Sequence, residues 1–125
     1  MELLLLRHSI TPGNLKKQYI GVTDQPLAPE GEALAREKQP DMPRVEALWI
    51  SPMLRCRQTA QVLFPGLCPR EIPDLRECNF GDFEGRTWAE IKDHPAFQAW
   101  IGGDQTAALP NGGSVGAFYA RCRHG

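Results

Sequence analysis

Five residues of this chain have side chains of the kinds that bind and transfer a phosphoryl group: Arg7, His8, Asn14, Arg55 and Glu77. The guanidinium of arginine is planar and matches phosphate oxygens in a bidentate way. Two arginines that meet at one point repel each other unless an anion lies between them. If the fold brings these residues together, they form an anion site, and phosphate is its expected occupant.

The histidine and the glutamate of this set have the chemistry of a nucleophile and an acid. A neutral imidazole keeps a free lone pair near neutral pH, so His8 is able to attack phosphorus. A carboxylic acid beside a phosphate dianion is favoured in its protonated form. Glu77 is therefore expected to donate a proton to a leaving oxygen.

Three predicted strands have to position these residues. Residues 2–6 are continuously apolar after the first and predict a short, fully buried strand directly before Arg7 and His8. Residues 45–50 predict a second strand before Ser51, and residues 70–72 predict a weaker one shortly before Glu77. Ligands bind beyond the carboxyl ends of strands in an open α/β sheet, so the three segments are expected to meet at one edge.

Predicted helices alternate with these strands. Thr11 and Ser51 each precede a proline, which predicts helices starting at Pro12 and Pro52, with N-termini that add N–H donors to the anion site. Further helices are predicted at 29–38, in parts of 87–100 with a break at His94-Pro95, and at 114–123 after a loop at 102–113. The alternation predicts an α/β fold with a mostly parallel sheet flanked by helices.

Length and composition describe one ordinary domain. A chain of 125 residues suffices for one domain with a hydrophobic core and not for two. Its 14 basic and 15 acidic residues give a formal net charge of -1, so no nucleic-acid partner is expected. No apolar run approaches the roughly 20 residues of a membrane helix, so no membrane partner is expected. The 4 cysteines form no C-x-x-C pair, which favours free thiols in the cytoplasm over a metal or disulfide scaffold.

Four stretches resemble, in their order along the chain, the signatures of the histidine phosphatase superfamily, also called phosphoglycerate-mutase-like. Residues 7–14 (RHSITPGN) resemble R-H-G-x-T-x-x-N, and residues 19–27 (YIGVTDQPL) resemble Y-x-G-x-T-D-x-P-L. Residues 51–60 (SPMLRCRQTA) resemble S-P-x-x-R-A-x-Q-T-A. Residues 75–85 (LRECNFGDFEG) resemble L-R-E-x-x-F-G-x-W-E-G, in a form most similar to the α-ribazole phosphatase branch.

The resemblance implies a three-layer α/β/α fold and a role for each matched residue. His8 would be the nucleophile that forms a phosphohistidine. Glu77 would protonate the leaving group and then assist the water that hydrolyses the intermediate. Neither a cofactor nor a metal is implied, because the arginines neutralise the charge. The other matched residues would hold the phosphoryl oxygens (Arg7, Asn14 and Arg55) or border the substrate (Gly21 and Thr23).

The chain departs from the family pattern at three places. Ser9 stands where glycine is usual, which would cost about 1 kcal/mol if that position required a positive φ. Residues 111–114 (NGGS) replace G-G-E-S, so a carboxylate before Ser114 is absent. The family's second catalytic histidine follows a later strand that this sequence does not contain. His124 follows a predicted helix and is not expected to replace it, so we expect residues 1–125 to be the amino-terminal portion of one longer domain.

Residues of the same type compete for two of these roles. Arg55 and Arg57 are two residues apart on a predicted helix and point about 200° from each other, so both cannot reach one phosphate. The motif selects Arg55 and leaves Arg57 solvated or ion-paired. The L-R-E context selects Glu77 as the acid and leaves Glu84 to structural hydrogen bonds. Taken singly, three of the matched residues also have ordinary structural interpretations: Arg7, His8 and Asn14.

Three functions are compatible with these patterns. The first is a phosphatase that acts on a small phosphorylated metabolite such as α-ribazole 5'-phosphate. The second is a phosphoglycerate mutase, which returns the phosphoryl group to a different oxygen; residues 80–85 (FGDFEG) favour the phosphatase by resemblance. The third is an inactive phosphate-binding fragment that lacks the second histidine. Neither the exact substrate nor the oligomeric state has a signal in the sequence.

Overall fold

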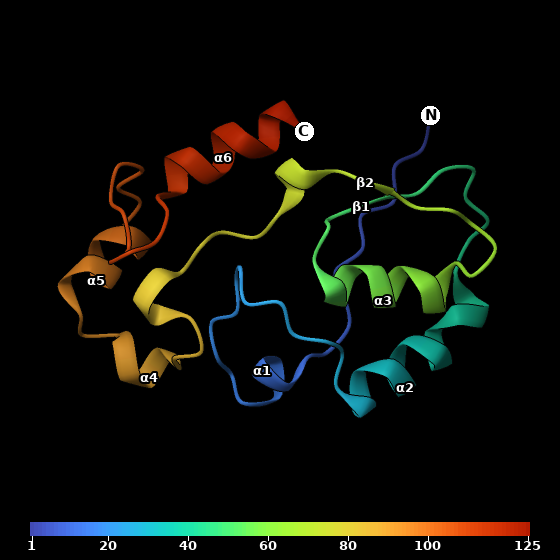
Figure 1. The fold of residues 1–125 in the computed structure, drawn as a ribbon, viewed down its shortest axis with the longest axis horizontal. Helices are drawn as coiled ribbons and strands as arrows, with labels where there is room; N and C mark the ends of the chain where they lie inside the picture. The colour runs from blue at the N-terminus through green and yellow to red at the C-terminus, as the bar shows by residue number, and fades with distance from the viewer.

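The computed structural model describes all residues, 1–125, as a series of short helices around one pair of strands (Figure 1). Helices α2 and α3 lie beside β1 and β2 at one end of the molecule, α4 and α5 lie at the other, and α1 lies between them. None of the helices has the length and hydrophobicity to span a bilayer. The elements are α1 (Pro12–Leu15), α2 (Pro29–Lys38), η1 (Gln39–Asp41), β1 (Trp49–Ile50), α3 (Leu54–Leu63), β2 (Arg70–Glu71), η2 (Pro73–Leu75), η3 (Gly81–Phe83), α4 (Trp88–Ile91), α5 (Pro95–Ile101) and α6 (Val115–His124).

The two strands form a parallel pair joined by α3. Trp49 pairs with Arg70, and Ile50 pairs with Glu71. Only residues 49–50 of the predicted strand 45–50 enter this ladder, although the carbonyl of Leu48 also accepts a hydrogen bond from the N–H of Arg70 at 2.9 Å. A strand, a helix and a parallel strand in sequence confirm the predicted α/β class.

Residues 2–6 do not form the buried strand that their apolar run predicts. Their backbone groups take part in no hydrogen bond within the chain, and Leu3 and Leu5 are 69% and 83% exposed. The prediction is wrong because an apolar run becomes a strand only where another strand supplies the ladder. The sheet consists of β1 and β2 only, and residues 2–6 pair with neither outer edge of it.

Local signals placed most helices correctly. Helix α2 has the predicted bounds, the break between α4 and α5 falls at His94-Pro95, and Ser114 caps α6 by accepting from the N–H of Ala117 at 3.2 Å. Helix α1 begins at Pro12 behind Thr11, as predicted. In each case the signal is a residue adjacent to the helix end, so no distant contact was needed.

Helix α3 begins later than its sequence predicts. Ser51 and Pro52 lie before the helix, which starts at Leu54 after an extended Met53. The N–H of Leu54 donates to Oδ1 of Asp24 at 2.7 Å. A carboxylate from a loop 30 residues away thus supplies the cap, where the sequence offered Ser51.

The apolar interior contains two small clusters of buried side chains. One contains Phe83, Ile91, Phe97 and Leu109, and the other contains Ala35, Leu63 and Phe64. Phe97 is 1% exposed and contacts the rings of Tyr19, Phe83 and Trp100. The first cluster therefore packs α5 against η3, which contains Phe83, and against α4, which contains Ile91.

We expect Phe97→Ala to lower the free energy of unfolding by about 3–5 kcal/mol, because it removes a buried ring and leaves a cavity. Tyr119→Ala is the matched control, since that ring is 49% exposed on α6. Urea denaturation followed by circular dichroism measures both variants. Equal losses in the two variants would contradict the assignment of Phe97 to the core.

Candidate active site

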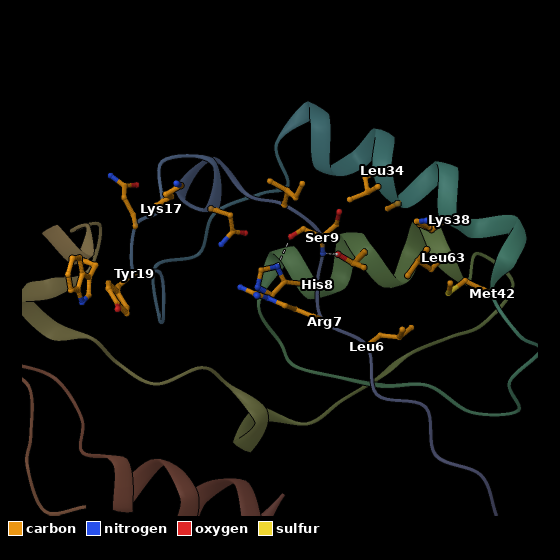
Figure 2. A pocket seen from close by; sticks show the side chains of 16 residues that line it. Leu6, Arg7, His8, Ser9, Lys17, Tyr19, Leu34, Lys38, Met42 and Leu63 are labelled. Carbon is orange, nitrogen blue, oxygen red and sulfur yellow. Dashed lines mark hydrogen bonds between the residues drawn. The ribbon is translucent and has the colours of Figure 1, made fainter. Parts of the chain in front are cut away.

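His8 is half-buried and makes one hydrogen bond through its ring. Its Nδ1 lies 2.6 Å from the carbonyl oxygen of Ser9 (Figure 2). A carbonyl only accepts, so this contact requires a proton on Nδ1. In the neutral imidazole the lone pair then lies on Nε2, which makes no hydrogen bond within the protein. The ring is thereby held in the tautomer that leaves Nε2 able to act as a nucleophile.

The backbone that carries His8 is anchored through Ser9. The Ser9 N–H donates to Oγ1 of Thr59 at 2.9 Å, and its hydroxyl donates to the carbonyl of Gly31 at 2.7 Å. Ser9 is not among the non-glycine residues with positive φ, which are Lys17 and Asn111. Serine therefore costs nothing in backbone strain at this position, and its hydroxyl adds a contact to α2.

Arg55 lies in the first turn of α3 and is 2% exposed. Its Nη1 donates to the carbonyl of Thr23 at 3.1 Å, and its Nη2 donates to the carbonyl of Gly21 at 2.8 Å. Its Nε is buried and has no hydrogen-bond partner, and no carboxylate pairs with the guanidinium. The neighbouring Arg57 instead pairs with Glu71, at 2.7 Å between Nε and Oε1, as the sequence predicted. Arg55 is thus a buried cation that forms no ion pair with a carboxylate of the chain.

The surroundings of His8 favour its neutral form. Burial lowers the pKa of the imidazole below its usual 6.5, and the charges of Arg55 and Arg7 lower the pKa further. The hydrogen bond to Ser9 and the charge of Glu77 act in the opposite direction and are outweighed. Both arginines and the glutamate selected from the sequence are therefore close enough to act on the same ring.

Asn14 has a structural task in α1 in addition to its expected contact with phosphate. Its Oδ1 accepts from the N–H of Thr11 at 2.9 Å and from the Thr11 hydroxyl at 3.0 Å, which completes a capping box. The two donors fix the amide so that its oxygen faces Thr11. Its Nδ2 donates to no group of the chain, and Asn14 lines the same cavity as His8.

Glu77 is half-buried and lies between η2 and η3. Its Oε1 accepts from the N–H of Cys78 at 2.8 Å, so one carboxylate oxygen is held by its own backbone. Arg121 of α6 donates to the carbonyls of Arg76 and Glu77 at 2.8 and 3.2 Å. The position of Glu77 thus depends on a helix 44 residues further along the chain.

Residues 21–23 form a loop held by two charged side chains. Arg55 binds its carbonyls, and Glu84 accepts from the N–H groups of Gly21 and Val22 at 3.0 and 2.9 Å and from the Thr23 hydroxyl at 2.8 Å. The sequence-based assignment of Glu84 to structural hydrogen bonds is confirmed by these contacts. Asp24 and Thr59 were not singled out from the sequence, although both lie in the matched stretches, because their partners are distant along the chain.

A cavity of about 660 Å³ opens beside His8 (Figure 2). Arg7, His8 and Asn14 line it together with Lys17, Tyr19 and apolar residues of α2 and α3. Arg55, Glu77, Gly21 and Thr23 do not line this cavity. The structure therefore brings Arg7, His8 and Asn14 to one cavity, and it leaves Gly21 and Thr23 outside both the cavity lining and the groups that act on the imidazole. No group of three His, Cys, Asp or Glu side chains could hold a metal ion.

His124 lies at the end of α6 and pairs with Asp74. Its side chain is 85% exposed, it does not line the cavity, and it does not act on the pKa of His8. This placement agrees with its rejection as a second catalytic histidine.

The sequence model of the histidine phosphatase superfamily (branch 1) matches residues 3–125. Sedoheptulose 1,7-bisphosphatase of Saccharomyces cerevisiae is 33% identical over 107 residues, which are 70% of this chain and 39% of that protein. The metal-independent phosphoserine phosphatase of Arabidopsis thaliana is 28% identical over 125 residues, 90% of this chain and 50% of that protein. The chain thus spans half or less of the length of these two relatives.

Solved structures share the fold. The proposed α-ribazole-5'-P phosphatase of Escherichia coli superposes with a TM-score of 0.83 at 26% identity, covering 95% of this chain and 62% of that one. A phosphoglycerate mutase of Thermus thermophilus superposes with a TM-score of 0.76 at 39% identity, covering 92% of this chain and 64% of that one. The predicted phosphoglycerate-mutase-like fold is confirmed by these superpositions.

The lowered pKa of His8 makes the stability of the protein depend on pH. In the unfolded chain the imidazole titrates near 6.5, and in the folded chain it titrates lower. Between the two pKa values the unfolded state binds more protons, so the free energy of unfolding should fall as the pH is lowered through this window. In His8→Gln this contribution is absent and the fall should be smaller. Urea denaturation of both proteins at pH about 8 and about 5 measures the difference, and equal falls would show that His8 is not shifted.

Proposed function

The chain belongs to the histidine phosphatase superfamily, branch 1, and from this we propose that it hydrolyses a small phosphorylated metabolite through a phosphohistidine intermediate. The observation that carries the proposal is that the buried Arg55 guanidinium lies close enough to His8 for its charge to lower the pKa of the imidazole. A buried guanidinium with no carboxylate partner lies beside an imidazole that is kept neutral with its Nε2 lone pair free. Burying an unpaired cation is costly, and an oxyanion at this place compensates it.

The first chemical step transfers the phosphoryl group to the protein. Nε2 of His8 attacks phosphorus, a P–N bond forms and the bond from phosphorus to the ester oxygen breaks. The leaving oxygen takes a proton from Glu77. Three groups would hold the remaining phosphoryl oxygens: Arg7, Arg55 through the N–H groups not used by the loop, and Nδ2 of Asn14.

The second step restores the protein. Glu77, now a carboxylate, accepts a proton from a water molecule whose oxygen attacks phosphorus, and the P–N bond breaks. Inorganic phosphate leaves and His8 returns to its neutral form. Gly21 and Thr23 would border the rest of the substrate, and the step uses neither a metal nor a cofactor.

The substrate class is a small phosphate ester. The relatives named above are a sugar bisphosphatase and a phosphoserine phosphatase, which supports a metabolite rather than a protein or nucleic acid. α-Ribazole 5'-phosphate is the specific candidate, on the form of residues 75–85 and on the Escherichia coli structure that bears this proposed activity.

A phosphoglycerate mutase is the second candidate, favoured by the Thermus thermophilus structure. Both activities begin with the same phosphohistidine and differ in its fate. Assays that measure free phosphate and isomerised product from the same reaction separate them, and a predominance of isomer would replace the phosphatase with the mutase.

The third candidate is a phosphate-binding protein with little turnover. The chain lacks the strand and second histidine that the family resemblance implies, and it covers 62–64% of the two solved structures described above. We expect residues 1–125 to be weakly active at best. A turnover number equal to that of an extended protein that carries the second histidine would contradict this expectation.

Brief incubation with radiolabelled acetyl phosphate should label the protein with an acid-labile, alkali-stable adduct. His8→Ala should reduce the label to background because it removes the attacking nitrogen. His124→Ala is the matched control and should keep the label, since that imidazole is exposed and pairs with Asp74. Undiminished labelling of the His8→Ala variant would rule out the proposed nucleophile.

A further inference from the structure

The carboxylate of Glu84 accepts four hydrogen bonds. Its Oε2 accepts from the N–H of Gly21 at 3.0 Å and from the hydroxyl of Thr23 at 2.8 Å. Its Oε1 accepts from the N–H groups of Val22 and Phe80 at 2.9 and 3.1 Å. Three of the four donors belong to the loop of residues 21–23, and hydrogen bonds to a charged acceptor are about twice as strong as neutral ones.

Arg55 binds the same loop from the carbonyl side of the loop's peptide groups. The guanidinium binds the carbonyls of Gly21 and Thr23, while the carboxylate of Glu84 binds the N–H groups. The peptide dipoles of the loop are therefore aligned between a negative and a positive side chain. Arg55 and Glu84 form no ion pair with each other, so the loop backbone is the connection between them.

Gly21 allows the loop of residues 21–23 to lie directly against residues 78–84. A Cβ at position 21 would lie 1.9 Å from the carbonyl oxygen of Cys78 and 2.7 Å from Oε1 of Glu84. Only a residue without a side chain lets the loop backbone approach residues 78–84 this closely. The loop is thus fitted against the segment that begins one residue after Glu77.

We propose that Glu84 is a positioning residue for the phosphoryl-binding site, acting through residues 21–23 on the guanidinium of Arg55. The carboxylate holds the loop, and the loop carbonyls orient the guanidinium that lies near His8. The bond from Phe80 ties the segment after Glu77 to the same carboxylate. This inference rests on the proposed function, because it assigns Arg55 to an anion.

The alternative is that Glu84 is only a nearby negative charge. The two interpretations predict opposite changes in phosphate affinity when the charge of Glu84 is removed. Removing a negative charge near an anion site should tighten the binding of phosphate if Glu84 has no positioning role. If Glu84 orients Arg55 through the loop, the same change should weaken binding, because the guanidinium loses its fixed direction.

Glu84→Gln tests this with inorganic phosphate as the probe. The amide keeps the size of the side chain and removes its charge. Its NH₂ group takes the place of one carboxylate oxygen and cannot accept hydrogen bonds from the N–H groups of the loop. We expect phosphate to bind at least about tenfold more weakly than to the parent protein, measured by isothermal titration calorimetry. Glu90→Gln is the matched control: its carboxylate accepts from the N–H and hydroxyl of Thr87 at 2.7 and 3.0 Å at the start of α4, and phosphate binding should be unchanged.

A Glu84→Gln variant that melts at the parent temperature and binds phosphate equally or more tightly overturns the inference. If the variant does not fold, amide hydrogen exchange in the parent protein, with and without phosphate, tests whether the loop of residues 21–23 is coupled to the phosphate site. Saturating phosphate should slow exchange of the Gly21 and Val22 amides and leave the Thr87 amide unchanged; unchanged exchange at Gly21 and Val22 overturns the inference. A parent protein that neither binds phosphate nor labels at His8 removes the proposed function instead.

Discussion

The burial of the Arg55 guanidinium is the constraint on which the rest of the site depends. A cation that is 2% exposed and lacks a carboxylate partner is stable only if other groups satisfy it. Two loop carbonyls satisfy part of it, and its Nε faces no acceptor of the chain. The same loss of water that makes the guanidinium attract an anion also keeps His8 neutral, since burial is the largest cause of its lowered pKa. One environment therefore acts on both the side chain that we propose binds phosphate and the side chain that we propose attacks it.

Polar contacts, more than apolar packing, connect the segments around this constraint. Thr59 accepts from the N–H of Ser9 and donates to the carbonyl of Arg55 at 2.7 Å, which joins the His8 segment to α3. Asp24 caps α3 from the loop that Arg55 holds. Of the two apolar clusters, the one around Leu63 lines the cavity beside His8 with Ala35 and Leu63. The site is therefore organised by hydrogen bonds between segments that are 30 to 63 residues apart.

Helix ends were predictable because their signals are local. Thr11, Ser114 and the prolines after Thr11 and His94 act on groups within three residues, so their effect depends little on the remainder of the fold. The residues selected around His8 were predictable for a different reason. They lie in four stretches that resemble one family, and Arg7, Arg55 and Glu77 are the groups whose charges act on the imidazole.

The amino-acid sequence by itself determined the α/β class, the helix boundaries with adjacent caps, and the residue types gathered near His8. Tertiary structure alone decided that residues 2–6 remain unpaired, that Asp24 replaces Ser51 as the cap of α3, and that Arg55 donates to the carbonyls of a loop more than 30 residues away. The physical reason is the range of the interactions. Caps and turns are satisfied within a few residues, whereas a strand ladder, a distant carboxylate and a buried guanidinium find their partners only after the chain has folded.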